Sequence, residues 1–124
     1  DFVGSANLIR IRKELPSAGN TRRLQTESDT VLLTHTAGLI GEGTALAVRG
    51  EEITMADDGP VAEGQLAGVI ESVEFRGSVT GYIVRTAVGR IHVDTWSARQ
   101  SHQRKRGSSV ILSLPKDSAL VGAL

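Results

Sequence analysis

The sequence predicts an all-β protein built of small barrels or a sandwich, with little helix. Apolar and polar residues alternate with a period of two in several short segments, as half-buried strands require. In Leu8–Arg12 the isoleucines and the arginines point to opposite faces, and in Val110–Leu114 the apolar residues share one face. The 14 glycines lie largely between such segments, where the chain must turn.

Seven segments with this pattern are predicted strands. Those in the second half of the chain predict an antiparallel meander closed by a distant last strand, which suits a five-stranded barrel with Greek-key closure. Ser97–Arg106 is the best helix candidate, but it has almost no apolar face, so a helix there would be short and solvated. The predicted strands are Leu8–Arg12, Thr30–Thr36, Ala45–Arg49, Val69–Phe75, Val79–Thr86, Arg90–Thr95 and Ser109–Leu114.

A turn signal at Asp57-Asp58-Gly59-Pro60 divides the chain into approximate halves, residues 1–56 and 61–124. Each half carries three or four predicted strands, which is marginal for an independent core. We therefore expect the halves to share strands or to pack face to face. A rough duplication is suggested, although no residue-level repeat is visible.

Composition excludes several classes of chemistry. The absence of cysteine excludes disulfides, thiolate zinc sites and a cysteine nucleophile. The motif G-x-x-x-x-G-K-[ST] does not occur, so no recognisable phosphate cradle is present. The three histidines, His35, His92 and His102, lie far apart in the sequence and lack metal-ligand spacing. We therefore predict a chain with no catalytic residue, no metal and no cofactor of its own.

Charge is unevenly distributed although the formal net charge is zero. The segment Glu51–Glu74 holds seven acidic residues and no basic one, and between Arg76 and Arg106 the only acidic residue is Asp94. The basic tract Arg99–Arg106 could grip phosphates or contact an acidic surface, including Glu51–Glu74 itself. Grooves for single-stranded nucleic acid combine positive charge with aromatic side chains. Only Trp96 lies near this tract, which argues against nucleic acid as a partner.

Four motifs, in order, resemble the TOBE (transport-associated OB) region at the C-terminus of ATP-binding subunits of bacterial ABC importers. Val48–Ile53 is similar to the family's V-R-P-E-D-I corner, with Gly50 for proline and Glu52 for aspartate. Three further segments are similar to motifs of the family: Phe2–Leu8 is similar to F-I-G-x-x-N, Gly68–Ser78 to G-x-V-x-x-V-E-x-x-G-S, and Gly107–Leu114 to G-x-x-V-x-L-S-L.

The resemblance, to the maltose, polyamine and ferric-iron group, implies OB-fold-like barrels in two interlaced halves with a non-catalytic regulatory and dimerisation role. ATP and magnesium would bind in an upstream ATPase domain, so this region should neither bind nor hydrolyse ATP. The implied partners are a second ATP-binding subunit, a permease and a solute-binding protein. The implied location is cytoplasmic, at the inner face of the cell membrane through the permease.

The interface or hinge candidates lie at two places, the corner and the glycine turn after the long predicted strand. For each of them, maintenance of the fold is the alternative role. The alternative function for the whole chain is an OB-type module that binds a small anion or single-stranded nucleic acid through Arg99–Arg106. The candidates are Arg49, Glu51 and Glu52 at the corner, and Arg76, Gly77, Ser78 and Tyr82 around the turn.

Overall fold

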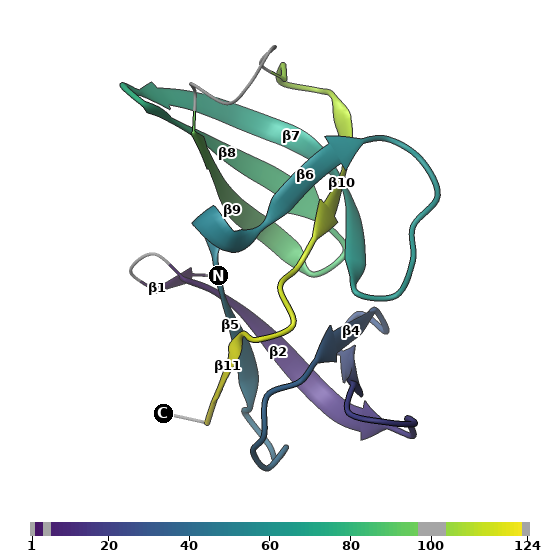
Figure 1. Cartoon of the computed structure of the whole chain (residues 1–124). Coiled ribbons are helices and arrows are strands. Elements are labelled where there is room, and N and C mark those ends of the chain that lie inside the picture. The colour runs from purple at the N-terminus through teal and green to yellow at the C-terminus, as the bar shows by residue number, and fades with distance from the viewer. Residues whose placement is uncertain (1, 4–5, 97–103, 123–124) are drawn as a thin grey trace.

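The computed structural model describes residues 2–3, 6–96 and 104–122, and it forms two antiparallel sheets (Figure 1). The prediction of an all-β fold is confirmed, since the only helical element in these residues is a 3₁₀ turn, η1 (Gly50–Glu52). The predicted helix at Ser97–Arg106 falls mainly on residues 97–103, which lie outside the described residues. The strands are β1 (Phe2–Val3), β2 (Ala6–Leu15), β3 (Arg22–Thr26), β4 (Val31–Thr34), β5 (Ala45–Arg49), β6 (Thr54–Asp57), β7 (Gln65–Arg76), β8 (Val79–Thr86), β9 (Gly89–Trp96), β10 (Ser109–Ser113) and β11 (Ala119–Val121).

Each sheet contains one strand that comes from the other half of the chain. The N-terminal sheet has the order β11-β5-β2-β3-β4, with β1 paired to β2, and the C-terminal sheet has the order β6-β10-β7-β8-β9. The meander β7-β8-β9 was expected, and β10 returns to pair with β7. The strand that completes this sheet is β6, which precedes the meander, whereas the final strand β11 joins the other sheet (Figure 1).

The two halves repeat one topology. In the first half β2 pairs with β3 and β5, and β3 pairs with β4; in the second half β7 pairs with β8 and β10, and β8 pairs with β9. The first strand of each half also carries an irregularity, between Ile11 and Lys13 in β2 and between Ile70 and Ser72 in β7. Such bulges bend a long strand so that it can serve two sides of a small barrel.

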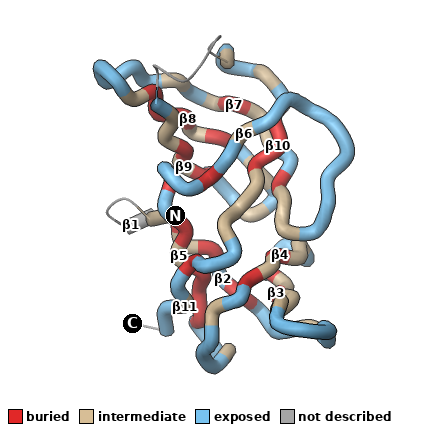
Figure 2. The backbone as a smooth tube through the Cα atoms, in the orientation of Figure 1, coloured by how far each residue is buried: buried red, intermediate tan, exposed pale blue. Residues whose placement is uncertain are grey.

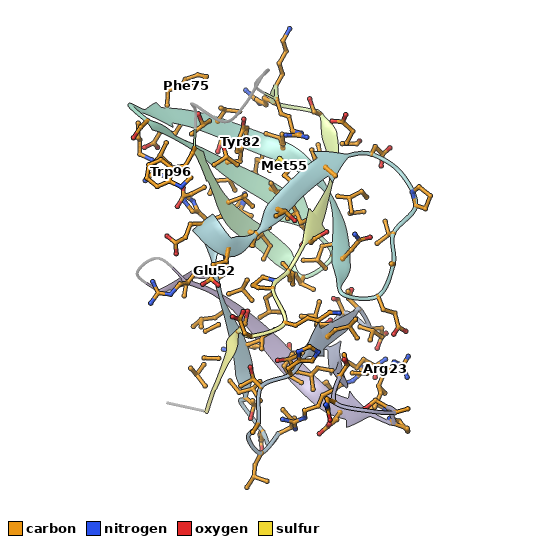
Figure 3. All side chains as sticks on the ribbon, in the orientation of Figure 1. Arg23, Glu52, Met55, Phe75, Tyr82 and Trp96 are labelled. Atoms are coloured by element: carbon orange, nitrogen blue, oxygen red, sulfur yellow. The ribbon has the colours of Figure 1, made fainter. Side chains whose placement is uncertain are left out.

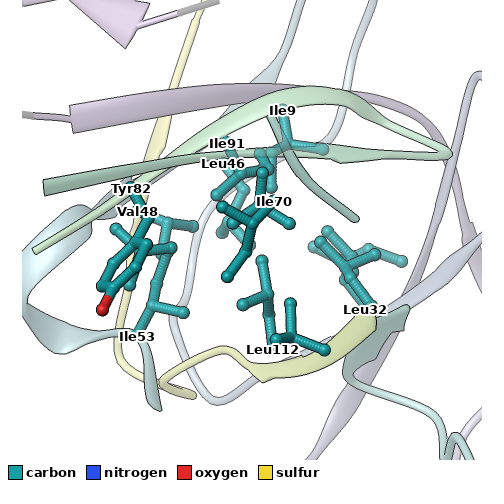
Figure 4. Packing of buried hydrophobic residues seen from close by; sticks show 14 of the residues in the cluster. Ile9, Leu32, Leu46, Val48, Ile53, Ile70, Tyr82, Ile91 and Leu112 are labelled. Atoms are coloured by element: carbon teal, nitrogen blue, oxygen red, sulfur yellow. The ribbon is translucent and has the colours of Figure 1, made fainter. Parts of the chain in front are cut away.

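One apolar cluster joins both halves. Leu24, Leu32 and Leu46 of the N-terminal sheet belong to the same cluster as Tyr82 and Leu112 of the C-terminal sheet, and all five are fully buried (Figures 2 and 4). Burial of a large apolar side chain stabilises a fold by about 1.5–3 kcal/mol. Because the cluster is shared, the stability of each half depends on the other.

Polar contacts also connect the halves along the edge strand β4. The Lys116 carbonyl accepts hydrogen bonds from the His35 backbone N–H (2.7 Å) and from the Thr34 hydroxyl (3.1 Å). Arg23 of β3 forms a two-pronged ion pair with Glu63 (Nε–Oε1 3.0 Å, Nη2–Oε2 2.7 Å). The hydrogen bonds from Arg23 hold the pKa of Glu63 below its usual value.

This ion pair predicts a pH-dependent contribution to stability. Because the pKa of Glu63 is lower in the folded chain than in the unfolded one, the contribution is fully present above the unfolded pKa. It is lost as the pH falls through the lower folded value. Thermal unfolding of Glu63→Gln should therefore show a lower Tm than wild type at pH 7 and the same Tm at acidic pH.

The exposed Glu42, which has no ion pair with a described residue, supplies the control for this measurement. Glu42→Gln should leave the Tm unchanged at both pH values. If Glu63→Gln lowered the Tm by the same amount at pH 7 and at acidic pH, the ion pair would contribute nothing to stability through its charge.

Candidate functional site

The corner after β5 is packed against the edge strand β9. Gly50, the first residue of η1, is buried, and a Cβ atom at this position would lie 2.7 Å from the His92 carbonyl oxygen. That separation is shorter than any side chain tolerates, so the corner approaches β9 this closely only because residue 50 is glycine. This contact is a physical reason for glycine at position 50, where the motif V-R-P-E-D-I has proline.

Asn7 connects β5 and β9 through its side-chain amide. Its Nδ2 donates to the Val48 carbonyl (3.1 Å) and to the His92 carbonyl (2.9 Å), and its Oδ1 accepts from the His92 N–H (2.7 Å). The amide therefore pairs with the edge of β9 much as another strand would. Asn7 is fully buried and is the asparagine of the F-I-G-x-x-N similarity.

Arg76 crosses β8 to reach β9. Its Nη2 lies 2.5 Å from Asp94 Oδ1, and the same oxygen lies 2.8 Å from His92 Nε2. A Cβ atom at Gly81, the β8 residue between them, would lie 2.7 Å from Arg76 Nη2, so the glycine gives the guanidinium its path. Glu74 adds a weaker ion pair with Arg76 at 3.6 Å.

These contacts join the corner and the β7–β8 hairpin into one face, which we call the corner–β9 surface: Arg49, Glu51, Glu52, Arg76, His92 and Asp94. Arg49 and Glu51 form an exposed ion pair of 3.8 Å. Trp96, at the end of β9, is 57% exposed, and it lies on the same side of the molecule as Glu52 (Figure 3). The surface carries charges of both signs on elements that the fold holds in place.

The remaining predicted site residues fall at different places. Gly77 and Ser78 form the two-residue turn between β7 and β8, where Gly77 adopts a φ of 70°. Tyr82 has no exposed surface and packs in the shared core (Figure 4). This burial favours the alternative role given for Tyr82, maintenance of the fold.

Three residues of this region were not among the predicted candidates: Asn7, His92 and Asp94. A signal for Asn7 exists in the sequence, because it shares the parity of Ile9 and Ile11 and so falls on the buried face of β2. A polar side chain at such a position requires hydrogen-bond partners. No comparable local signal marks His92 and Asp94.

The basic tract is only partly described, since residues 99–103 lie outside the described residues. Arg104 donates its backbone N–H to the Tyr82 hydroxyl (3.3 Å), and its Nη2 lies 3.4 Å from Asp57 Oδ1. The expected contact with the acidic stretch Glu51–Glu74 is thus present for this arginine. Lys105 and Arg106 are exposed.

Two further features concern the described residues alone. They contain no group of three histidine, aspartate or glutamate side chains arranged to hold a metal ion. Over the same part of the chain, no helix has the length and apolarity needed to span a membrane.

The topology defines the class of protein, an OB-type β-barrel module. The chain belongs to the TOBE domain family, whose sequence profile matches residues 46–121. No curated protein sequence matches it.

A solved structure with the same fold is that of the cytoplasmic molybdate-binding protein ModG with molybdate bound. The similarity covers 98% of this chain and 99% of that chain, with a TM-score of 0.73 and 14% sequence identity. The predicted OB-type fold is thereby confirmed.

Proposed function

We propose that this chain is the regulatory and dimerisation domain of the ATP-binding subunit of a bacterial ABC importer. The observation that carries the proposal is the corner–β9 surface. Its corner, which is similar to the motif V-R-P-E-D-I, packs against β9 at Gly50 and is hydrogen-bonded to β9 through Asn7. ATP and magnesium would bind in a separate domain of the subunit, and the permease would hold the subunit at the membrane.

The charge pattern of this surface supports contact with a second copy of the chain. An interface with two-fold symmetry uses the same patch on both subunits, so the patch must be complementary to itself. The corner–β9 surface meets this condition, because the cations Arg49 and Arg76 alternate with Glu51, Glu52 and Asp94 over a short span. Trp96 at its margin adds the kind of aromatic group that is enriched in interfaces.

Sedimentation of the chain over a concentration series tests this proposal. We expect a reversible dimer with a Kd of about 10 µM, as befits a small interface. Arg76→Glu should weaken it by about tenfold, because the reversed charge faces carboxylates on both copies.

Lys13→Glu is the matched control, since it makes the same charge change on exposed β2, outside the corner–β9 surface. It should leave the dimer unchanged. A chain that stays monomeric at all concentrations, or two variants with equal effects, would contradict the proposed surface.

Binding of a small oxyanion is the second candidate, supported by the full-length similarity to ModG with molybdate bound. The exposed Lys105 and Arg106 belong to the described part of the tract considered for anions or single-stranded nucleic acid. Calorimetric titration with molybdate, and with a single-stranded oligonucleotide at two salt concentrations, separates these outcomes, since nucleic-acid binding falls steeply with salt.

A further inference from the structure

A groove with a volume of about 1090 Å³ lies between the two halves, away from the corner. One wall consists of Leu8–Arg10 of β2, Ala45 of β5 and the β3–β4 turn, and the other is the β8–β9 turn with Arg90. Sites for small molecules often lie between structural units and occupy roughly 300–1,000 Å³. The groove has the position of such a site, and its volume lies slightly above the upper end of this range.

Most of the groove lining is apolar. Leu8 and Ala45 contribute from the N-terminal half, Val88 contributes from the β8–β9 turn, and Val121 closes the end near β11. Water against such a lining finds few hydrogen-bond partners, so an apolar group gains free energy by replacing it. The lining therefore favours a ligand with an apolar body.

The two halves each present a guanidinium to this groove. Arg90 is held by Glu71, with Nη2 2.9 Å from Oε1, whereas Arg10 has no acidic partner among the residues that the structure describes. Arg85 stands directly opposite Arg90 in the β8–β9 ladder, and Glu71 is the anion that lies near both of these arginines. Glu27, also on the lining, forms no ion pair with a described residue, and its formal charge is opposite to that of Arg10.

We propose that the groove binds an organic anion with an apolar body, independently of the dimer surface described above. The apolar body lies against Leu8, Ala45 and Val88, and the acidic group pairs with Arg10 on the side of the groove that faces Arg90. An inorganic oxyanion has no apolar surface that could pack against this lining. The site therefore differs in ligand class from the second candidate function.

Two fluorescent probes of the same shape test the proposal. 8-Anilinonaphthalene-1-sulfonate carries an anionic group, and N-phenyl-1-naphthylamine has the same rings without it. We expect the wild-type chain to bind the sulfonate about tenfold more tightly than the uncharged probe, as one additional charged contact of moderate strength would produce. In Arg10→Gln this difference should disappear, while binding of the uncharged probe stays unchanged.

Three further variants define the site. Glu27→Gln should tighten the sulfonate about threefold, because it removes a repelling carboxylate. Arg12→Gln is the matched control, because this arginine also lies on β2 but pairs with Asp29 and does not line the groove, so both affinities should stay at wild-type values. Ala87→Trp, at an exposed position of the lining, should fill the groove and abolish binding of both probes.

Circular dichroism verifies that each variant is folded. If Ala87→Trp does not fold, the probe affinities of Arg10→Gln and Glu27→Gln test whether the groove binds the anion. Equal affinity for the two probes in wild type would overturn the proposal. So would a preference for the sulfonate that Arg10→Gln leaves intact, since the anion would then bind elsewhere.

Discussion

Gly50→Ala should destabilise the chain by about 2 kcal/mol, because its Cβ atom meets a backbone oxygen that cannot rotate away. The new atom would lie 2.7 Å from the His92 carbonyl oxygen, so either η1 or β9 must shift. A shift of β9 also stretches the hydrogen bonds between His92 and Asn7. In a chain of this size the loss corresponds to a decrease in Tm of about 8 °C in calorimetry.

Gly59→Ala provides the matched control, since a Cβ atom there meets nothing within 4 Å. Its Tm should equal that of wild type or rise slightly, because alanine restricts the unfolded chain. If the two alanine variants had equal stability, the close approach between the corner and β9 would not exist in solution.

Asn7→Ala should be the more damaging substitution, with a loss of about 3 kcal/mol in the free energy of unfolding. It leaves the His92 N–H and two carbonyl groups, those of Val48 and His92, without their side-chain partner. Asn7→Asp should also destabilise at neutral pH, because a buried carboxylate would face two carbonyl oxygens. Urea denaturation measures both losses.

Asn20, the other asparagine of the chain, is exposed in the turn after β2. Asn20→Ala should change the free energy of unfolding by less than about 0.5 kcal/mol. An Asn7→Ala variant as stable as Asn20→Ala would mean that water replaces the amide at no cost.

Most of the predicted strands have at least two large inward apolar residues, and β4, with only Leu32, was predicted from its β-branched residues. Ile91 and Val93 mark β9, and Val110 and Leu112 mark β10, and each pair is buried as the period of two requires. The strand β3 was missed because Leu24 is its only large apolar residue. Its other inward residue, Thr26, is buried through hydroxyl contacts with the turn amides of Ser28 and Thr30.

Two other missed strands, β6 and β11, owe their conformation to the opposite half of the chain. Both are short and carry few buried residues, so neither has a local pattern to read. Each becomes a strand by pairing with a segment more than 50 residues away in sequence, β10 and β5 respectively. Local periodicity cannot reveal such pairing, since it depends on the completed fold.

The candidate site shows the same division. The corner motif indicated Arg49, Glu51 and Glu52, and these residues do lie on one exposed turn. The strand that supports this turn, however, contributes His92 and Asp94 from some 40 positions further along. Side chains from distant strands meet only after the sheets pack. The sequence alone therefore could not show that the residues of the corner–β9 surface lie next to one another.

The exchange of β6 and β11 has a consequence for how the chain acquires its structure during translation. The N-terminal sheet receives β11 only after the strands of the C-terminal sheet, β6 to β10, have been made. Until β11 emerges, β5 therefore keeps one edge unpaired, and neither barrel is complete before strands of both halves have been synthesised.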